Sequence, residues 1–252
     1  MAALRDDATA FSAAIGDDLA AHVPACPEWT ARDLVIHLGH VYQWWEAVVA
    51  RRPADEAAVE QLHTELAAIR EVEIARLATA ERPELVNWFD AYAQQLQRTL
   101  SAAAPEDHNW TWFPPDQTAG FVQRRMAQET AVHRWDMQDT FGTAKEIAPD
   151  VAADGIDEWL EIHFPMSKEE GEDWGTNGSM HIHTTDAAGE WLMTLEPSGP
   201  SFSRDHAKAD VAVRGTASDL LLVLWGRKPP ETVEILGERS VLDRYLTIID
   251  LD

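Results

Sequence analysis

Glu129 and His133, four positions apart in the segment 118–141, could together bind a divalent metal ion. In a helix they fall among the apolar residues that would face a core, and residues four apart lie side by side on a helix surface. A carboxylate among core residues is unfavourable unless it is paired or bound to a metal. Carboxylate and imidazole groups are both zinc ligands. The segment therefore contains two candidate ligands.

A third candidate ligand, His37, lies at the edge of the apolar stripe of the segment 30–52. His40 is turned further from that stripe, so we expect His37, and not His40, to lean toward a bundle core. If the helices 30–52 and 118–141 face each other, the three candidates converge. Two imidazoles and one carboxylate are typical of catalytic zinc sites, where a fourth position stays open for water or a thiol.

Spacing alone leaves other interpretations open. Glu129 and His133 can form a buried hydrogen-bonded pair, or Glu129 can pair with Arg125. A single histidine in a core is also more often structural than a metal ligand. His181 and His183 alternate with apolar residues and would share one face of a strand. That spacing suits a metal, but we favour a half-exposed strand face for the pair.

The elements that must position these residues begin with a helical region. It ends near residue 142, and its long loop carries Trp110 and Trp112, two candidates for lining a ligand pocket. Thr30 and Thr118 are suited to cap the helices that they precede. A joint without regular structure is expected over 24–29, and helices are expected over 7–22, 30–52, 55–80, 83–104 and 118–141.

Beyond Pro149 the pattern changes to a mixture of helices and strands. A helix is expected over 150–163, a polar loop over 168–178, a hairpin over 180–197, strands over 209–215 and 232–236, and helices over 216–225 and 239–249. The predicted fold class is α+β. An up-down four-helix bundle over 1–145 is followed by a smaller α+β domain over 146–252.

Composition excludes several kinds of partner. The chain has 44 acidic and 20 basic residues and a formal charge of −24, so its surface repels nucleic acids and anionic lipids. The single cysteine, Cys26, cannot form an internal disulfide and fits a reducing compartment. We find no signal peptide and no apolar run of the ~20 residues that span a membrane. We expect a cytoplasmic protein; the sequence does not indicate its oligomeric state.

Two sequence motifs resemble those of the mycothiol-dependent maleylpyruvate isomerase family. The first is CPEWTARDLVIHLGHVYQWW, and the second is MAQETAVHRWDMQ, preceded by TWFPPDQTAGFVQRR. HTTDAAGEWLMTLEP and VRGTASDLLLVLWGR resemble the C-terminal domain of the family. The resemblance implies a DinB-like bundle followed by a sterol-carrier-like domain. It also implies that His37, Glu129 and His133 are metal ligands, with zinc as the expected ion.

The resemblance further implies a cofactor and a reaction. Mycothiol, a low-molecular-weight thiol, binds between the domains in this family, and an arginine of the C-terminal domain acts in catalysis. Arg227 is our candidate for that arginine, ahead of Arg214. It could bind a substrate carboxylate or a developing enolate. A metal-bound thiol favours the nucleophilic thiolate, which would add to a cis double bond for isomerisation or to another small electrophile for S-transfer.

Two other functions fit the same residues. A bundle joined to a carrier-like domain could sequester a thiol or a small apolar molecule without catalysis. Alternatively, water at the open metal position could make the protein a thiol-independent hydrolase. The residues that would recognise the substrate cannot be identified from motifs, so the sequence does not separate these functions.

Overall fold

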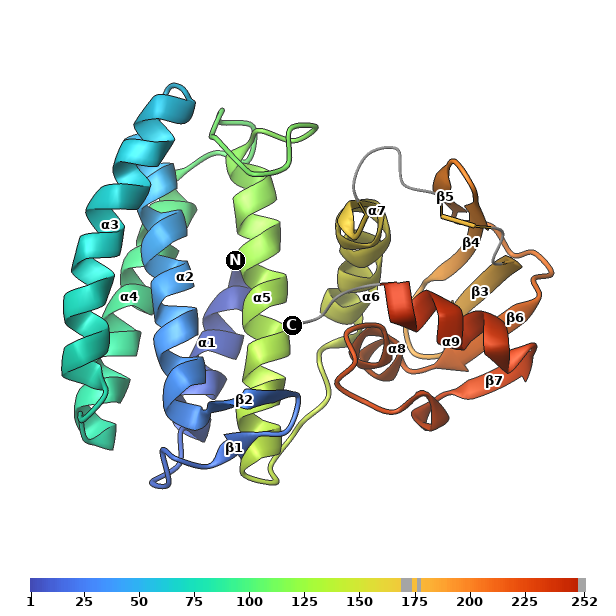
Figure 1. Cartoon of the computed structure of the whole chain (residues 1–252), viewed down its shortest axis with the longest axis horizontal. Helices are drawn as coiled ribbons and strands as arrows, with labels where there is room; N and C mark the ends of the chain where they lie inside the picture. The colour runs from blue at the N-terminus through green and yellow to red at the C-terminus, as the bar shows by residue number, and fades with distance from the viewer. Residues whose placement is uncertain (169–173, 176–177, 249–252) are drawn as a thin grey trace. The chain divides into compact units, whose positions relative to one another are not determined.

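The computed structural model describes residues 1–168, 174–175 and 178–248 and divides into two compact units, Met1–Lys145 and Glu146–Asp252. Figure 1 shows a first unit of helices and a second unit in which helices pack on a sheet. Each unit has its own apolar core. The predicted loop over 168–178 lies largely outside the described residues. Across the described ranges, no helix is long and apolar enough to cross a membrane.

The first unit, all of which the structure describes, is a helical bundle. The helices α1, α2, α4 and α5 pack against one another, and α3 lies along α2 (Figure 1). The predicted four-helix bundle is therefore confirmed, with α3 as an additional helix on its outside. The helices are α1 (Ala2–Ala14), α2 (Ala31–Arg51), α3 (Glu56–Leu77), α4 (Arg82–Ala102) and α5 (Ala119–Thr140).

The two helices that carry the candidate ligands begin at the predicted caps. The Thr30 hydroxyl accepts from the Asp33 backbone N–H, and the Asp33 carboxylate accepts from the Thr30 N–H at 2.9 Å. Thr118 accepts from the backbone N–H of Phe121 at 3.1 Å. Both caps satisfy backbone N–H groups that a helix start leaves unpaired. They therefore fix where α2 and α5 begin and, with that, the face of each helix on which its candidate ligands lie.

Two predictions near the start of the chain are wrong. The first helix covers Ala2–Ala14 instead of 7–22, because the backbone becomes extended at Ile15, with φ −61° and ψ 111°. At the next residue, Gly16, a Cβ would lie 2.5 Å from the Phe141 ring, so this close approach requires glycine. The expected joint over 24–29 contains a strand, β2 (Cys26–Thr30), which pairs antiparallel with β1 (His22–Val23). Pro24 and Ala25 connect these two strands. The small hairpin leads directly into the cap of α2.

The second unit is α+β, as predicted. Its strands lie in the order β5-β4-β3-β6-β7, and only the β3–β6 pair is parallel among the described strands. The strands are β3 (Gly178–Thr184), β4 (Glu190–Glu196), β5 (Gly199–Ser203), β6 (Val211–Gly215) and β7 (Glu234–Gly237). The helices are α6 (Pro149–Glu158), its continuation as a π-helical turn (Trp159–His163), α7 (Phe164–Met166), α8 (Ala217–Leu224), a 3-10 turn (Pro230–Thr232) and α9 (Arg239–Ile248).

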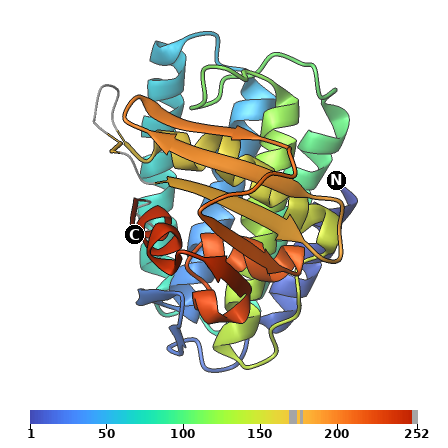
Figure 2. The same cartoon turned by 90° about the vertical axis from the view of Figure 1, so that its right-hand side faces the viewer.

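The sequence does not predict β5, because its glycine, proline and serines are typical of a loop. The expected hairpin over 180–197 is confirmed as β3 and β4, and the helix expected over 150–163 continues to Met166. Met180 and Ile182 are fully buried on the face of the sheet that meets the helices. Because side chains alternate along a strand, His181 and His183 lie on the opposite face, which Figure 2 views from outside.

Candidate metal centre

The helices α2 and α5 bring the three predicted ligands together. The Nε2 atom of His37, on α2, lies 3.4 Å from Oε1 of Glu129 on α5. The Nε2 atom of His133, one turn further along α5, lies 3.2 Å from the same oxygen. The two imidazole rings meet edge to face, with centroids 5.1 Å apart. Two nitrogens and one oxygen thus face a common point.

These donor atoms are spaced as ligands of one metal ion would be. Ligands about 2.0–2.2 Å from zinc at tetrahedral angles lie about 3.3–3.6 Å from one another. The N–O separations of 3.4 and 3.2 Å are close to this range and longer than the usual hydrogen bond of about 2.9 Å. The donor set fits a divalent metal and would leave a fourth position for another ligand.

Arg125 holds the carboxylate of Glu129 in place. Its guanidinium is buried, and Nη2 donates to Oε2 of Glu129 at 2.7 Å. The pairing of these two residues, which spacing alone left open, is therefore present together with the histidine contacts. Because Arg125 occupies Oε2, the other oxygen is directed at His37 and His133. The ion pair orients the carboxylate without competing for the oxygen that a metal would use.

Asp136 orients the imidazole of His133. The carboxylate of Asp136 is fully buried, and Oδ2 lies 2.9 Å from Nδ1 of His133. When Nδ1 carries a hydrogen, this N–H group donates to Asp136, and the unprotonated Nε2 atom faces His37 and Glu129. This arrangement is usual for histidines that bind metals. Arg134, the next residue after His133 on α5, donates from Nε to Asp7 at 3.0 Å.

The cluster is arranged to hold positive charge. Burial opposes the ionisation of Glu129, but His133, His37 and Arg125 outweigh it and hold the pKa of Glu129 well below its ordinary value. Burial also opposes protonation of His133, yet the hydrogen bonds that its ring donates to Asp136 and Glu129 raise its pKa to about 9. A proton on His133 and a metal ion use the same nitrogen, so each would displace the other.

Trp29 covers the two imidazoles, a contact that the sequence analysis does not identify. Its ring centroid lies 4.6 Å from that of His37 and 6.4 Å from that of His133. Trp29 belongs to β2, immediately before the Thr30 cap, so the hairpin positions the indole and the start of α2 together. The available signal was the place of this tryptophan in the motif CPEWT, one residue from the cap.

Family models match both units of the chain. Residues 1–138 match the model described as the mycothiol maleylpyruvate isomerase N-terminal domain, and residues 150–244 match the MDMPI C-terminal domain. The chain belongs to this family. Comparison with curated proteins gives no match.

Two crystal structures show the fold of the maleylpyruvate isomerase family. One is a histidine-to-alanine mutant of a mycothiol-dependent maleylpyruvate isomerase, with a TM-score of 0.61 and 14% identity. The other is the mycothiol-dependent maleylpyruvate isomerase, with a TM-score of 0.58 and 16% identity. Each alignment covers 94% of this chain and 92% of the other. At these identities the likeness shows a common fold and supports the predicted bundle followed by an α+β domain.

The prediction that His40 points away from the core is wrong. Its side chain is 11% exposed, whereas that of His37 is 34% exposed. The helix α3 covers this side of α2, and its Glu73 lies 3.3 Å from Nε2 of His40. His37 is the histidine that meets Glu129, as predicted, although it is the less buried of the two.

A cavity of about 420 Å³ opens beside His37. Its walls come from α2 and α3 and combine apolar, aromatic and polar groups: His37, His40, Val41, Trp44, Trp45, His63 and Arg70. Trp110 packs against both tryptophans of this wall, with ring centroids 6.0 and 6.4 Å away. The other candidate of that loop, Trp112, packs against Phe113 and Phe121. Trp110 is therefore the loop tryptophan that supports the cavity.

The two candidate arginines of the maleylpyruvate isomerase C-terminal domain differ in their surroundings. Arg227 follows α8, is partly buried, and donates from Nη1 to the Trp225 carbonyl at 2.9 Å. It borders a cavity of about 360 Å³ in the second unit. Arg214, on β6, is half exposed and lies 3.3 Å from Glu234. Arg227 is thus the arginine that lines a cavity, which favours it over Arg214 as a ligand-binding group.

Proposed function

We propose that this protein is a metal-dependent enzyme that uses mycothiol as its nucleophile. The reaction would be cis–trans isomerisation of a small substrate, as the names of its structural relatives suggest, or transfer of the thiol to a small electrophile. The observation that carries the proposal is the convergence of His37, Glu129 and His133 on one point. Membership of the family supports the thiol.

His37, Glu129 and His133 would hold the metal, and zinc suits two imidazoles and a carboxylate. When bound, the ion would supply positive charge that favours the thiolate form of a coordinated thiol over the thiol itself. Three protein ligands leave room for that fourth group. A catalytic site differs from a closed structural site in this respect.

The surrounding residues keep this arrangement rigid. Arg125 fixes the orientation of the Glu129 carboxylate, and Asp136 fixes the tautomer and ring plane of His133. Trp29 shields the two imidazoles on one side with an apolar ring. A site held in this way need not rearrange when charge develops during the reaction.

The cavity beside His37 would receive part of the thiol or the substrate. Val41 and Trp44 offer apolar surface, while Arg70 and His63 offer polar groups. Arg70 is itself positioned by hydrogen bonds to the Gln43 side chain and the His40 carbonyl, at 3.1 and 2.9 Å. Its cationic group suits a carboxylate or another anionic part of a small molecule.

We assign Arg227 the binding of a substrate carboxylate or of developing negative charge. Arg227→Met should reduce turnover by about a hundredfold, as loss of one anion-stabilising donor commonly does. Metal content should stay the same, because Arg227 is not a proposed ligand. Arg214→Met is the matched control and should retain wild-type turnover. Equal loss in both variants would argue against a specific role for Arg227.

Mass spectrometry of reactions with mycothiol tests the proposed function directly. Zinc-loaded protein would be mixed with mycothiol and a panel of electrophiles that includes maleylpyruvate. We expect an isomerised product or a thiol adduct with the zinc-loaded wild type. Neither the metal-free protein nor the His133→Ala variant should form it. His108→Ala, which removes an exposed histidine, is the control. In cobalt-substituted protein, mycothiol should also change the visible absorption spectrum.

Two outcomes would overturn the proposal. Hydrolysis of a substrate without mycothiol, with no spectral change on adding the thiol, would identify a thiol-independent hydrolase. A spectral change on adding mycothiol, but no turnover of any electrophile, would identify a thiol-binding protein without catalysis.

A further inference from the structure

Three histidines and a glutamate meet on the outer face of the five-stranded sheet. His181 and His183 come from β3, and Glu190 begins β4 directly opposite His183. His206 lies in the segment between β5 and β6 and reaches the same carboxylate. We call these four residues the sheet cluster. All of them belong to the second unit, so they are separate from the ligands on α2 and α5.

The donor atoms of the sheet cluster surround a small space. Nδ1 of His183 lies 2.6 Å from Oε1 of Glu190, and Nδ1 of His206 lies 2.9 Å from Oε2. Nε2 of His181 lies 3.9 Å from Oε2. One donor atom from each of the four residues lies within 4.8 Å of the others. These separations bracket the spacing of about 3.3–3.6 Å expected between ligands of tetrahedral zinc.

His181 provides a second, independent indication of a ligand. The residue is 6% exposed, and its Nε2 atom has no hydrogen-bond partner within the described part of the chain. Its ring centroid lies 5.3 Å from that of His206 and 6.1 Å from that of His183, so it faces the cluster. A buried polar atom without a hydrogen-bond partner is unfavourable, because it loses its contacts with water and gains none in the protein. A metal ion bound at Nε2 would remove that penalty.

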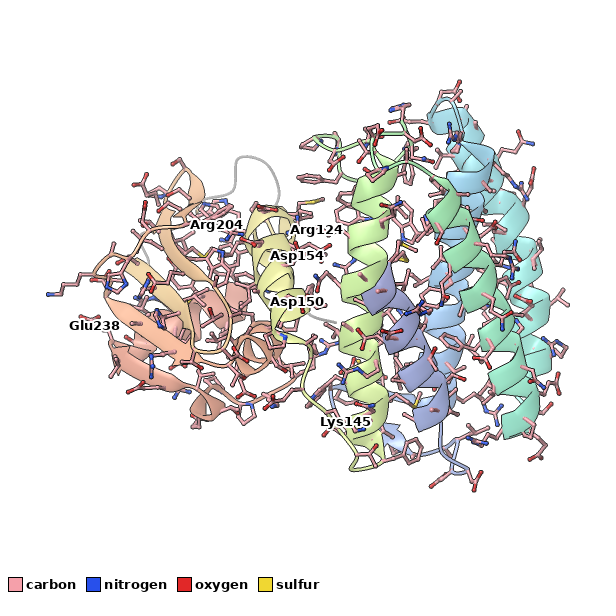
Figure 3. All side chains as sticks on the ribbon, turned by 180° about the vertical axis from the view of Figure 1, so that it is seen from behind. Arg124, Lys145, Asp150, Asp154, Arg204 and Glu238 are labelled. Carbon is pink, nitrogen blue, oxygen red and sulfur yellow. The ribbon has the colours of Figure 1, made fainter. Side chains whose placement is uncertain are left out.

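His206 is held in place although its side chain is 79% exposed. Arg204, two residues earlier and labelled in Figure 3, forms an ion pair with Asp157 of α6. The Arg204 guanidinium also lies over the ring of Trp191, 5.7 Å from its centroid. These contacts anchor the start of the segment that carries His206. The fourth donor is thereby kept near the sheet.

Hydrogen bonding alone does not account for the sheet cluster. Glu190 can accept from His183 and His206, but this leaves Nε2 of His181 buried and 3.9 Å away. We propose that His181, His183, Glu190 and His206 bind a second divalent metal ion, zinc by the chemistry of their donors. Four protein ligands would close the site, so the ion would be structural.

Counting zinc in variants of the whole chain tests this inference. Protein without a histidine tag would be stripped with a chelator, dialysed against micromolar Zn²⁺ and measured by elemental analysis. We expect about two zinc ions per wild-type chain and about one in the double variant His183→Ala/His206→Ala. His133→Ala should also retain about one, and combining all three substitutions should leave none. The single variant His206→Ala is the reserve if the double variant folds poorly, and it should bind the second ion at least about tenfold more weakly.

The control variant His22→Ala/His108→Ala also lacks two histidines, both exposed and outside the two clusters. It should keep about two zinc ions. Equal zinc content in the wild type and in His183→Ala/His206→Ala would overturn the sheet site. A single wild-type zinc that His133→Ala loses would overturn it too and leave the bundle site standing. A single zinc lost only in His183→Ala/His206→Ala would support the sheet site and contradict the bundle site.

Discussion

The two histidine–carboxylate clusters of this chain are built on different supports. In the bundle, Glu129 and His133 lie one turn apart on α5, and α2 contributes His37. On the sheet, two residues of one strand meet a residue of the next strand and a histidine from a connecting segment. We refer to the first set as the bundle cluster. Both sets combine imidazoles with one carboxylate.

The clusters differ in what holds their ligands. In the bundle cluster, Arg125 binds the spare oxygen of Glu129, and Asp136 binds the far nitrogen of His133. In the sheet cluster, both oxygens of Glu190 face imidazoles. External support allows three ligands to stay in place with one position open, whereas ligands that hold only one another need a fourth donor to enclose an ion. The first arrangement suits chemistry and the second suits stability.

The largest difference should appear in turnover. His133→Ala or His37→Ala should reduce mycothiol-dependent turnover by at least about a thousandfold, because the charge stabilisation that a catalytic metal supplies amounts to several kcal/mol. His183→Ala/His206→Ala should retain most of the wild-type rate. Steady-state assays of all three variants at saturating zinc make the comparison. Comparable losses in the bundle and sheet variants would show that the two clusters do not differ in function.

A smaller difference should follow from removing external support. Asp136→Asn should weaken zinc binding at the bundle cluster by about 10–100-fold, as loss of a partner that orients a metal-bound histidine usually does. Zinc binding at the sheet cluster should be unchanged, so the same protein contains its own control. Competition with a chelating indicator measures both affinities. Unchanged binding at the bundle cluster would mean that packing of α5 alone positions His133.

The bundle cluster could be identified from the sequence because its main spacing is local. The helical period places Glu129 and His133 on one face of 118–141, and the cap at Thr118 fixes the phase of that helix. The third ligand, His37, is not determined by a local spacing. The periodicity of α2 favours His37 over His40 but predicts the wrong burial for His40. Covering by α3 is a tertiary contact, and no pattern within α2 contains it. The contact of Trp29 with the two imidazoles is also tertiary, and no pattern within a single element contains it.

The sheet cluster shows where sequence patterns stop being sufficient. Alternation along β3 places His181 and His183 on one face, and the sequence suggested that pair. The contribution of Glu190 depends on the register of a hairpin whose turn spans five residues. The contribution of His206 depends on β5, which the sequence does not predict, and on where the chain returns afterwards. The four donors come from three segments of the chain, and the sequence alone therefore indicated only two of them.

The pH dependence of zinc binding should separate the clusters by a moderate amount. His133 has a pKa of about 9, so below that pH a proton occupies the nitrogen that zinc needs. Binding at the bundle cluster should therefore strengthen by about tenfold per pH unit between about pH 7 and pH 8.5. The pKa of His181 shifts in the opposite direction, because burial lowers it, so at pH 7 and above its ring has no ionising proton to lose before zinc binds. Chelator competition on His133→Ala and on His183→Ala/His206→Ala measures each cluster alone; equal slopes would contradict the difference.

The smallest expected effect concerns folding stability, measured in a His133→Ala background so that only the sheet cluster can bind zinc. Without metal, His206→Ala should change the free energy of unfolding by less than about 0.5 kcal/mol, since the side chain is largely exposed. With zinc at a hundred times the dissociation constant, the parent should gain about 2.7 kcal/mol. A tenfold weaker site should lose about 1.4 kcal/mol of that gain. Urea unfolding with and without zinc measures both quantities. Destabilisation by His206→Ala in the absence of zinc would mean that the hydrogen bond to Glu190, and not a metal, explains why these four side chains meet.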